Sequence, residues 1–264
     1  MNRRDFITAA AGAAVLVDSE ADSIAHQEAG NPEFYELRVY KLRRGPSAGR
    51  FDAYVREAWM PAMKRLGIGP IGAFNVMLGP DSPAQYRLIP YRNLEELYTS
   101  RQRLSGDEEY KKAAAEYRNL PATDPPYLRA ESQLMVAFAS MPKLEVPQAA
   151  KDRKPRILEL RTYESHSVTA GRKKIEMFNK GEIAIFRKTG LTPVFFGETL
   201  IGQRQPNLTY MLAYDDMAAR DKAWSTFVTD PDWKALSSMP EYSDAAIVTS
   251  ISNVLLRPTQ YSEI

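Results

Sequence analysis

The sequence predicts an α+β protein built from two tandem ferredoxin-like units, each β-α-β-β-α-β, packed sheet to sheet. The main observation is that the pattern Glu-Leu-Arg-x-Tyr occurs twice, at 36–40 and at 159–163, which is a spacing of 123 residues. A constant shift that also relates distant landmarks indicates two copies of one structural unit. The landmark pairs are Gly67 and Gly190, Pro70 and Pro193, Tyr91 and Tyr214, Asp107 and Asp230, and Tyr110-Lys111 and Trp233-Lys234.

The first unit, residues 34–138, begins with alternating residues at 35–40, which predict a strand. A helix follows, with Ser47 as a candidate N-cap, a kink at Pro61 and an end at Gly67. Two apolar runs around a Gly/Pro-rich turn then predict a hairpin. Asn93 is a candidate cap for a second helix, and Asp107 begins a short one. The hairpin strands are expected at 71–78 and 84–91, and the last strand at 131–138.

The second unit, residues 156–257, repeats this plan after a proline-containing linker at 139–155. Each unit predicts a four-stranded antiparallel sheet with both helices on one face. The other sheet face needs a cover, and the other unit is the obvious one. The elements expected here are strands at 158–163, 194–201, 208–214 and 247–256, a helix at about 169–189, a helix carrying Trp224 and Phe227, and a short helix at 231–236.

The N-terminus resembles a twin-arginine export signal. Arg3-Arg4 and Phe6 precede an apolar stretch at 7–17 that is too short to span a bilayer, and Ser23-Ile24-Ala25 is a plausible cleavage site. We therefore expect residues 1–25 to be a signal peptide and the mature protein to be periplasmic, with no membrane span. A frayed cytoplasmic N-terminus is the alternative.

Composition excludes several classes of site. The chain has no cysteine, so neither a disulfide framework nor a thiolate metal site is available. Removing residues 1–25 takes away two arginines and four acidic residues, so the formal net charge rises from +2 to +4. That charge is mild and no Lys/Arg cluster stands out, so nucleic acid is not an expected partner.

The repeated opening strand, the Gly-x-x-Pro sequences at 67–70 and 190–193, and the aromatic-Lys steps at 110–111 and 233–234 resemble the NIPSNAP family. The resemblance covers about 34–138 and 156–257. It implies a dimeric α+β barrel, in which two ferredoxin-like sheets face each other, here fused in one chain. The family is largely without an established chemistry. Its barrel relatives include cofactor-free monooxygenases and several haem enzymes, and its mitochondrial members resemble adaptor or scaffold proteins.

Charged and phenolic residues alternate with apolar ones on both opening strands. If Leu37 and Val39 pack under the helices, then Glu36, Arg38 and Tyr40 point into the space between the sheets. The second unit places Glu159, Arg161 and Tyr163 there in the same way. Two readings stay open: ion pairs that only stabilise the fold, or arginines that bind an anionic ligand beside a carboxylate or phenol that acts as a base.

Histidines are scarce, because His26 lies at the expected cleavage boundary and only His166 remains inside the mature chain. A His-rich metal site cannot be built, and we expect no metal and no cofactor; a haem would need His166 or a tyrosine as its ligand. His166 follows Tyr163 in a loop, where a surface histidine is the ordinary interpretation. Tyr163 and His166 could, however, act together as an acid–base pair. On that hypothesis the second unit is the working half, meaning the half that carries the functional site.

Two classes of function follow. One is a small-molecule site between the sheets, for binding or for cofactor-free oxidation, and the other is a protein-interaction module whose barrel centre is merely core. Whether the chain is an enzyme stays open. A cavity between the sheets favours the first class, and solid packing there favours the second. For either class we expect a homo-oligomer.

Overall fold

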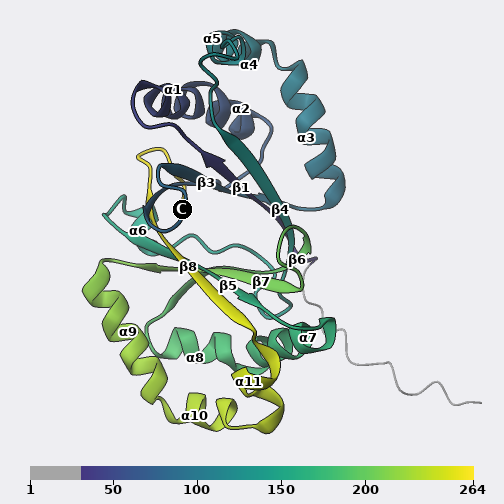
Figure 1. The fold of residues 1–264 in the computed structure, drawn as a ribbon, viewed down its shortest axis with the longest axis vertical. Coiled ribbons are helices and arrows are strands. Elements are labelled where there is room, and N and C mark those ends of the chain that lie inside the picture. The colour runs from purple at the N-terminus through teal and green to yellow at the C-terminus, as the bar shows by residue number, and fades with distance from the viewer. Residues whose placement is uncertain (1–30) are drawn as a thin grey trace, which may run out of the picture.

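The computed structural model describes residues 31–264, so the expected signal peptide lies outside the described residues. Eight antiparallel strands form a closed barrel in the order β1-β3-β2-β8-β5-β7-β6-β4. Helices of the first half cover one side of the barrel, and helices of the second half cover the opposite side (Figure 1). The expected α+β architecture of two units packed sheet to sheet is confirmed.

The first half contains β1 (Phe34–Lys41), α1 (Pro46–Tyr54), the π-helical turn η1 (Val55–Trp59), α2 (Met60–Arg65), β2 (Gly72–Leu78), β3 (Ala84–Tyr91), α3 (Leu94–Gly106), α4 (Glu108–Ala113), α5 (Ala115–Arg118) and β4 (Arg129–Ala137). The caps predicted for its later helices are present. The side chain of Asn93 accepts a hydrogen bond from the Glu96 amide, and that of Asp107 accepts one from the Tyr110 amide. Ser47 is not a cap, because α1 already begins at Pro46, whose fixed φ suits a first helical position.

The second half contains α6 (Gln148–Lys151), β5 (Ile157–Glu164), α7 (Val168–Met177), the π-helical turn η2 (Phe178–Glu182), α8 (Ile183–Lys188), β6 (Thr192–Ile201), β7 (Asn207–Tyr214), α9 (Met217–Thr229), α10 (Pro231–Ser237), the 3₁₀ turn η3 (Pro240–Tyr242), α11 (Asp244–Ile247) and β8 (Ser250–Pro258). The last strand begins three residues later than its apolar pattern suggests. Ile247 belongs to α11 instead, and its carbonyl accepts a hydrogen bond from the Ser165 hydroxyl.

Two strand pairs join the halves and close the barrel. β4 pairs with β6, and β2 pairs with β8, each with one register shift. Both joins use the second strand of one unit and the last strand of the other, so the halves are related by pseudo-twofold symmetry. Every sheet edge is paired in the process, which removes the exposed edges that a single unit would present.

A π-helical turn occurs at the same place in both halves. η1 and η2 are separated by the same 123 residues as the opening strands. Pro61, which is expected to disturb the first helix, lies just after η1 in α2, but the second half carries Ala184 at that position. The turn is therefore a feature of the unit and is not caused by the proline. Such turns are often found at functional sites.

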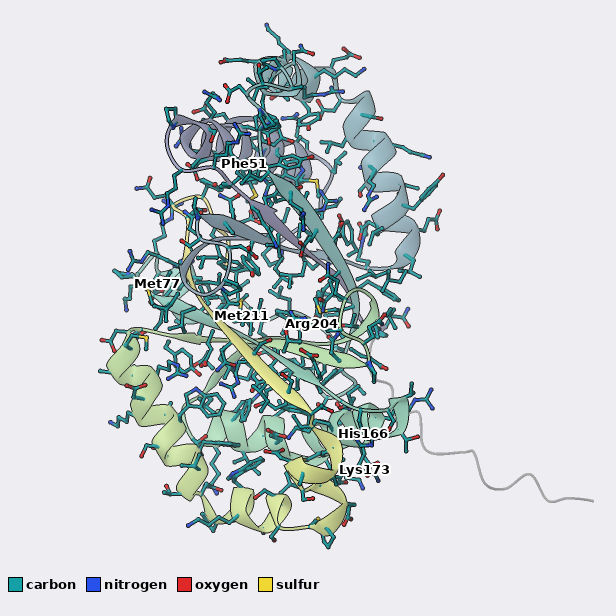
Figure 2. The ribbon with its side chains drawn as sticks, in the orientation of Figure 1. Phe51, Met77, His166, Lys173, Arg204 and Met211 are labelled. Carbon is teal, nitrogen blue, oxygen red and sulfur yellow. The ribbon has the colours of Figure 1, made fainter. Side chains whose placement is uncertain are left out.

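The barrel interior is a packed apolar core. Its buried residues come from both halves, and Met211 lies in the middle of it (Figure 2). The cluster contains Tyr35, Leu37, Phe74, Ala84, Tyr86, Leu88, Met135, Ala137, Leu158, Leu160, Val194, Phe195, Met211, Ala213, Leu256 and Ile264. Other clusters lie between each half-sheet and its own helices. In the described part of the chain, no helix is long and apolar enough to cross a membrane.

Candidate functional site

The charged residues of the opening strands face the helices, not the barrel interior. Leu37 belongs to the interior core and Val39 packs against it, which leaves Glu36, Arg38 and Tyr40 on the helix side of β1. The expectation that these side chains point between the sheets is therefore wrong. Alternation places them together on one face, but a closed barrel needs its centre filled by apolar residues from both halves. Only the helix side leaves the charged groups a route to solvent.

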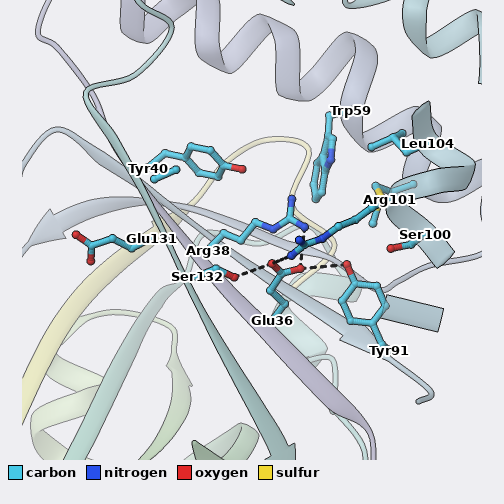
Figure 3. Close-up of a pocket in the computed structure, with 12 residues that line it drawn as sticks. Glu36, Arg38, Tyr40, Trp59, Tyr91, Ser100, Arg101, Leu104, Glu131 and Ser132 are labelled. Atoms are coloured by element: carbon cyan, nitrogen blue, oxygen red, sulfur yellow. Dashed lines mark hydrogen bonds and ion pairs between the residues drawn. The ribbon is translucent and has the colours of Figure 1, made fainter. Parts of the chain in front are cut away.

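Glu36 is the centre of a hydrogen-bond network in the first half. Its Oε2 accepts from Arg38 Nη2 at 2.7 Å and from the Tyr91 hydroxyl at 3.3 Å. Its Oε1 accepts from the Ser132 hydroxyl at 2.6 Å and from Arg101 Nη2 at 3.1 Å (Figure 3). Burial acts to raise the pKa of Glu36, but these hydrogen bonds and the two guanidinium charges outweigh it and hold the pKa below its ordinary value.

A pocket of about 300 Å³ opens beside this network, between the sheet and helices α2 and α3 (Figure 3). Its polar side is formed by Glu36, Arg38 and Arg101, and Trp59 from the π-helical turn stands over them. Its remaining lining residues are Tyr40, Met63, Tyr91, Ser100, Leu104, Ala130, Glu131 and Ser132. A concave site with apolar walls and a few convergent polar groups is the usual form of a ligand site, and this one lies at the small end of the usual range.

Glu159 is the matching centre in the second half, but its surroundings are closed. It is fully buried and accepts hydrogen bonds from Arg161 Nη1 at 3.0 Å, from Arg220 Nη2 at 2.7 Å and from Trp224 Nε1 at 3.0 Å. The Tyr214 hydroxyl adds a contact at 3.3 Å, the same distance as its first-half counterpart Tyr91 makes to Glu36. The guanidinium of Arg161 lies over the Trp224 ring, 4.6 Å from its centroid.

Aromatic residues fill the space that forms the pocket in the first half. At the 123-residue spacing, Phe186 replaces Met63, Trp224 replaces Arg101 and Phe227 replaces Leu104. The three rings pack together with centroid distances of 4.9 to 5.7 Å. The halves share the network around the central carboxylate, and the difference in side-chain size decides which of them is open.

Tyr163 and His166 do not form an acid–base pair. Tyr163 is buried, and its hydroxyl accepts hydrogen bonds from Tyr210 at 3.0 Å and from Arg161 Nη2 at 3.1 Å. His166 lies exposed in the loop before α7, at the periphery of the fold (Figure 2). The expectation that the second half is the working half is not supported at Glu159, where aromatic side chains fill the equivalent space, and the geometry favours the first half.

Sequence reasoning missed Trp59, Arg87 and Arg101 in the first half and Lys174, Glu182 and Arg220 in the second. All six lie on elements other than the opening strands, and their local sequences are those of ordinary helices and strands. The available signal was the repeat itself, since comparing the halves at the 123-residue spacing shows where charge and size differ. Within residues 31–264 no group of three potential metal ligands comes together.

The fold and this network define an α+β barrel protein of two fused ferredoxin-like units, with a pocket beside the buried carboxylate of the first half. The sequence model of the NIPSNAP family matches residues 35–139 and 158–263, and the chain belongs to the NIPSNAP family. Among curated protein sequences none matches it.

Three solved structures illustrate the likeness. A "putative monooxygenase" from Lactobacillus acidophilus is 9% identical, covers 86% of this chain and 94% of its own, and has a TM-score of 0.56. A Fusobacterium nucleatum protein with the same name is 9% identical, covers 86% of this chain and 93% of its own, and has a TM-score of 0.55. An uncharacterised NIPSNAP-like domain protein from Burkholderia xenovorans is 21% identical, with coverages of 40% and 88% and a TM-score of 0.37. At these identities the first two support the shared fold and nothing finer.

Proposed function

We propose that the protein binds a small organic molecule in the pocket between the first half-sheet and helices α2 and α3. The observation that carries the proposal is the contrast between the halves. Both halves have the same hydrogen-bond network around a buried carboxylate. The space beside that network is filled by Phe186, Trp224 and Phe227 in the second half and is open in the first. A pocket that only reflected the geometry of the repeated unit would be expected in both halves.

The location differs from the one expected from the sequence, because the space between the sheets is filled with apolar side chains. Solid packing there favours the alternative class, an interaction module without a ligand. The pocket on the helix side is an alternative site for a small molecule. Measuring whether a ligand binds there therefore distinguishes small-molecule binding from the interaction module.

The decisive experiment closes the pocket with the residues of the second half. Met63→Phe and Leu104→Phe are introduced together, and Leu94→Phe, on the exposed face of the same helix α3, is the matched control. Native mass spectrometry of each protein, purified from its own host, measures any retained small molecule. We expect retention by the wild type and by Leu94→Phe, and loss in the double variant with unchanged circular dichroism. Retention by the double variant, or by none of the proteins, contradicts the proposal and favours the interaction module.

Oxidation of the bound molecule by dioxygen without a cofactor is a narrower proposal. It is supported by two solved structures that share the fold at 9% identity and are named as monooxygenases. Oxygen uptake by the purified protein with its retained molecule tests it. Uptake should disappear in the closed double variant, and its absence in the wild type restricts the function to binding.

A further inference from the structure

Arg87 is a buried cation without a carboxylate partner. It lies on β3 and faces the helices, and it is 1% exposed. Its guanidinium is stacked among three rings, 4.5 Å from the centroid of Tyr40, 4.7 Å from Phe51 and 4.6 Å from Trp59. Within residues 31–264 it forms no ion pair, its Nη2 has no hydrogen-bond partner, and its Nε makes only a 3.3 Å contact with Gln85 Oε1.

The second half also buries a cation under its helices, but there the cation has a carboxylate partner. The counterparts of Phe51, Trp59 and Arg87 are Lys174, Glu182 and Tyr210. The buried cation is then Lys174, which packs near the ring of Phe178 and has its Nζ 3.1 Å from Glu182 Oε2. Both members of that pair are at most 2% exposed. The second half therefore neutralises its buried cation with a carboxylate on the π-helical turn, and the first half places Trp59 at that position.

An unpaired buried charge is costly, and contacts with aromatic rings offset only part of the cost. Two of the three rings around Arg87, those of Tyr40 and Trp59, also line the pocket. Arg38 is close enough that its charge, together with the larger effect of burial, lowers the pKa of Arg87. Arg87 thus adds positive potential behind the pocket wall, and no carboxylate of residues 31–264 is paired with it.

The pocket itself also carries surplus positive charge. Arg38 and Arg101 share the single carboxylate of Glu36, and in the described chain each makes only one hydrogen bond, through Nη2. Glu131, the other acidic lining residue, contacts Lys41 at 3.2 Å. Free guanidinium donors match the geometry of a carboxylate, which can take two of them at once.

Building on the function proposed above, we propose that the pocket selects an organic anion, a planar carboxylic acid in its ionised form. Its carboxylate would take the free donors of Arg38 and Arg101, and its planar part would lie against Trp59, between Met63 and Leu104. Arg87 acts as a positioning charge behind the Tyr40 and Trp59 rings. Its uncompensated charge serves recognition of the anion and contributes nothing to the stability of the ligand-free fold.

The test compares benzoate with its neutral analogue benzamide by calorimetry at low salt. We expect benzoate to bind at least tenfold more tightly. Arg87→Met should weaken benzoate binding about tenfold, leave benzamide binding unchanged, and leave the ligand-free protein at least as thermally stable as the wild type. Arg87→Lys should restore the preference for benzoate. Arg43→Met, which removes an exposed charge from the same half, is the control and should change the binding affinity of neither benzoate nor benzamide.

A second pair of variants copies the neutralised half and tests the charge of Arg87 without removing its side chain. Trp59→Glu places a carboxylate beside Arg87 and should abolish the preference for benzoate, whereas Trp59→Gln should keep it. Equal binding of benzoate and benzamide overturns the anion proposal but leaves small-molecule binding intact. A lower stability of ligand-free Arg87→Met, or an equal effect of Trp59→Glu and Trp59→Gln on the preference, overturns the role of Arg87. No binding of either compound, together with no retained molecule in the wild type, overturns the proposed function as well.

Discussion

Arg101 and Trp224 occupy equivalent positions in the two halves, and each donates a hydrogen bond to the buried glutamate of its opening strand. Arg101 Nη2 lies 3.1 Å from Glu36 Oε1, and Trp224 Nε1 lies 3.0 Å from Glu159 Oε2. The arginine is 62% exposed at the mouth of a pocket, whereas the indole closes its half over Arg161. One hydrogen-bonding role is thus filled by a side chain that leaves the site open and by another that seals it.

Arg38→Met and Arg161→Met separate the structural role from the binding role. Each glutamate keeps several other donors in these variants, so we expect each change to lower the free energy of unfolding by about 1.5–3 kcal/mol, the worth of one charged hydrogen bond. Only Arg38→Met should also weaken binding of the retained molecule. Urea denaturation and native mass spectrometry measure the two effects. Loss of ligand in Arg161→Met alone would restore the second half as the working site.

Acid should destabilise the protein through Glu36 and Glu159. Burial acts to raise the pKa of both, but arginine hydrogen bonds and charges outweigh it, so each folded-state pKa lies below the unfolded value of about 4.3. Their stabilisation is complete above that pH and is lost as the pH falls through the folded-state pKa. We expect the free energy of unfolding to fall below about pH 4 and this fall to be smaller in Glu36→Gln/Glu159→Gln. If the double variant loses as much stability below pH 4 as the wild type, Glu36 and Glu159 are not the cause of the acid destabilisation.

The Lys174–Glu182 pair should show strong coupling in a double-mutant cycle. Lys174→Met leaves Glu182 buried and without its cation, which should cost about 3–5 kcal/mol. Replacing both residues, as Lys174→Met/Glu182→Leu, should recover most of that loss, because two apolar side chains of similar volume need no neutralisation. Chemical denaturation of the two single variants and the double variant measures the cycle. Additive losses would show that the two side chains act independently.

Export through the twin-arginine route stays a prediction from the sequence, because its residues lie outside the described part of the chain. Replacing Arg3 and Arg4 together with lysine should leave the precursor in the cytoplasm of the producing cell. Replacing Arg43 and Arg44, a second arginine pair within the first unit, is the matched control and should not change export. Cell fractionation with immunoblotting measures the distribution, and normal export of the lysine variant rules the route out.

Much of the fold is readable from the sequence because it depends on local and repeated patterns. Alternation at 35–40, caps at Asn93 and Asp107, and the 123-residue spacing each act over short segments, and the structure confirms the elements they predict. The repeat then implies that two like sheets cover each other, since neither can leave its apolar face in water.

The sequence by itself determined that Glu36, Arg38 and Tyr40 share one face of a strand, and that the second half repeats them. Which face that is, and which half is open, were decided only by tertiary structure. Leu37 points into the barrel interior because the centre of the barrel must be filled by apolar side chains from both sheets. The charged residues, on the other face of the strand, therefore point toward the helices. The open half depends on whether Met63 and Leu104 or Phe186 and Phe227 stand over the sheet. This difference in side-chain volume has an effect only when α2 and α3, or α8 and α9, are packed on the sheet.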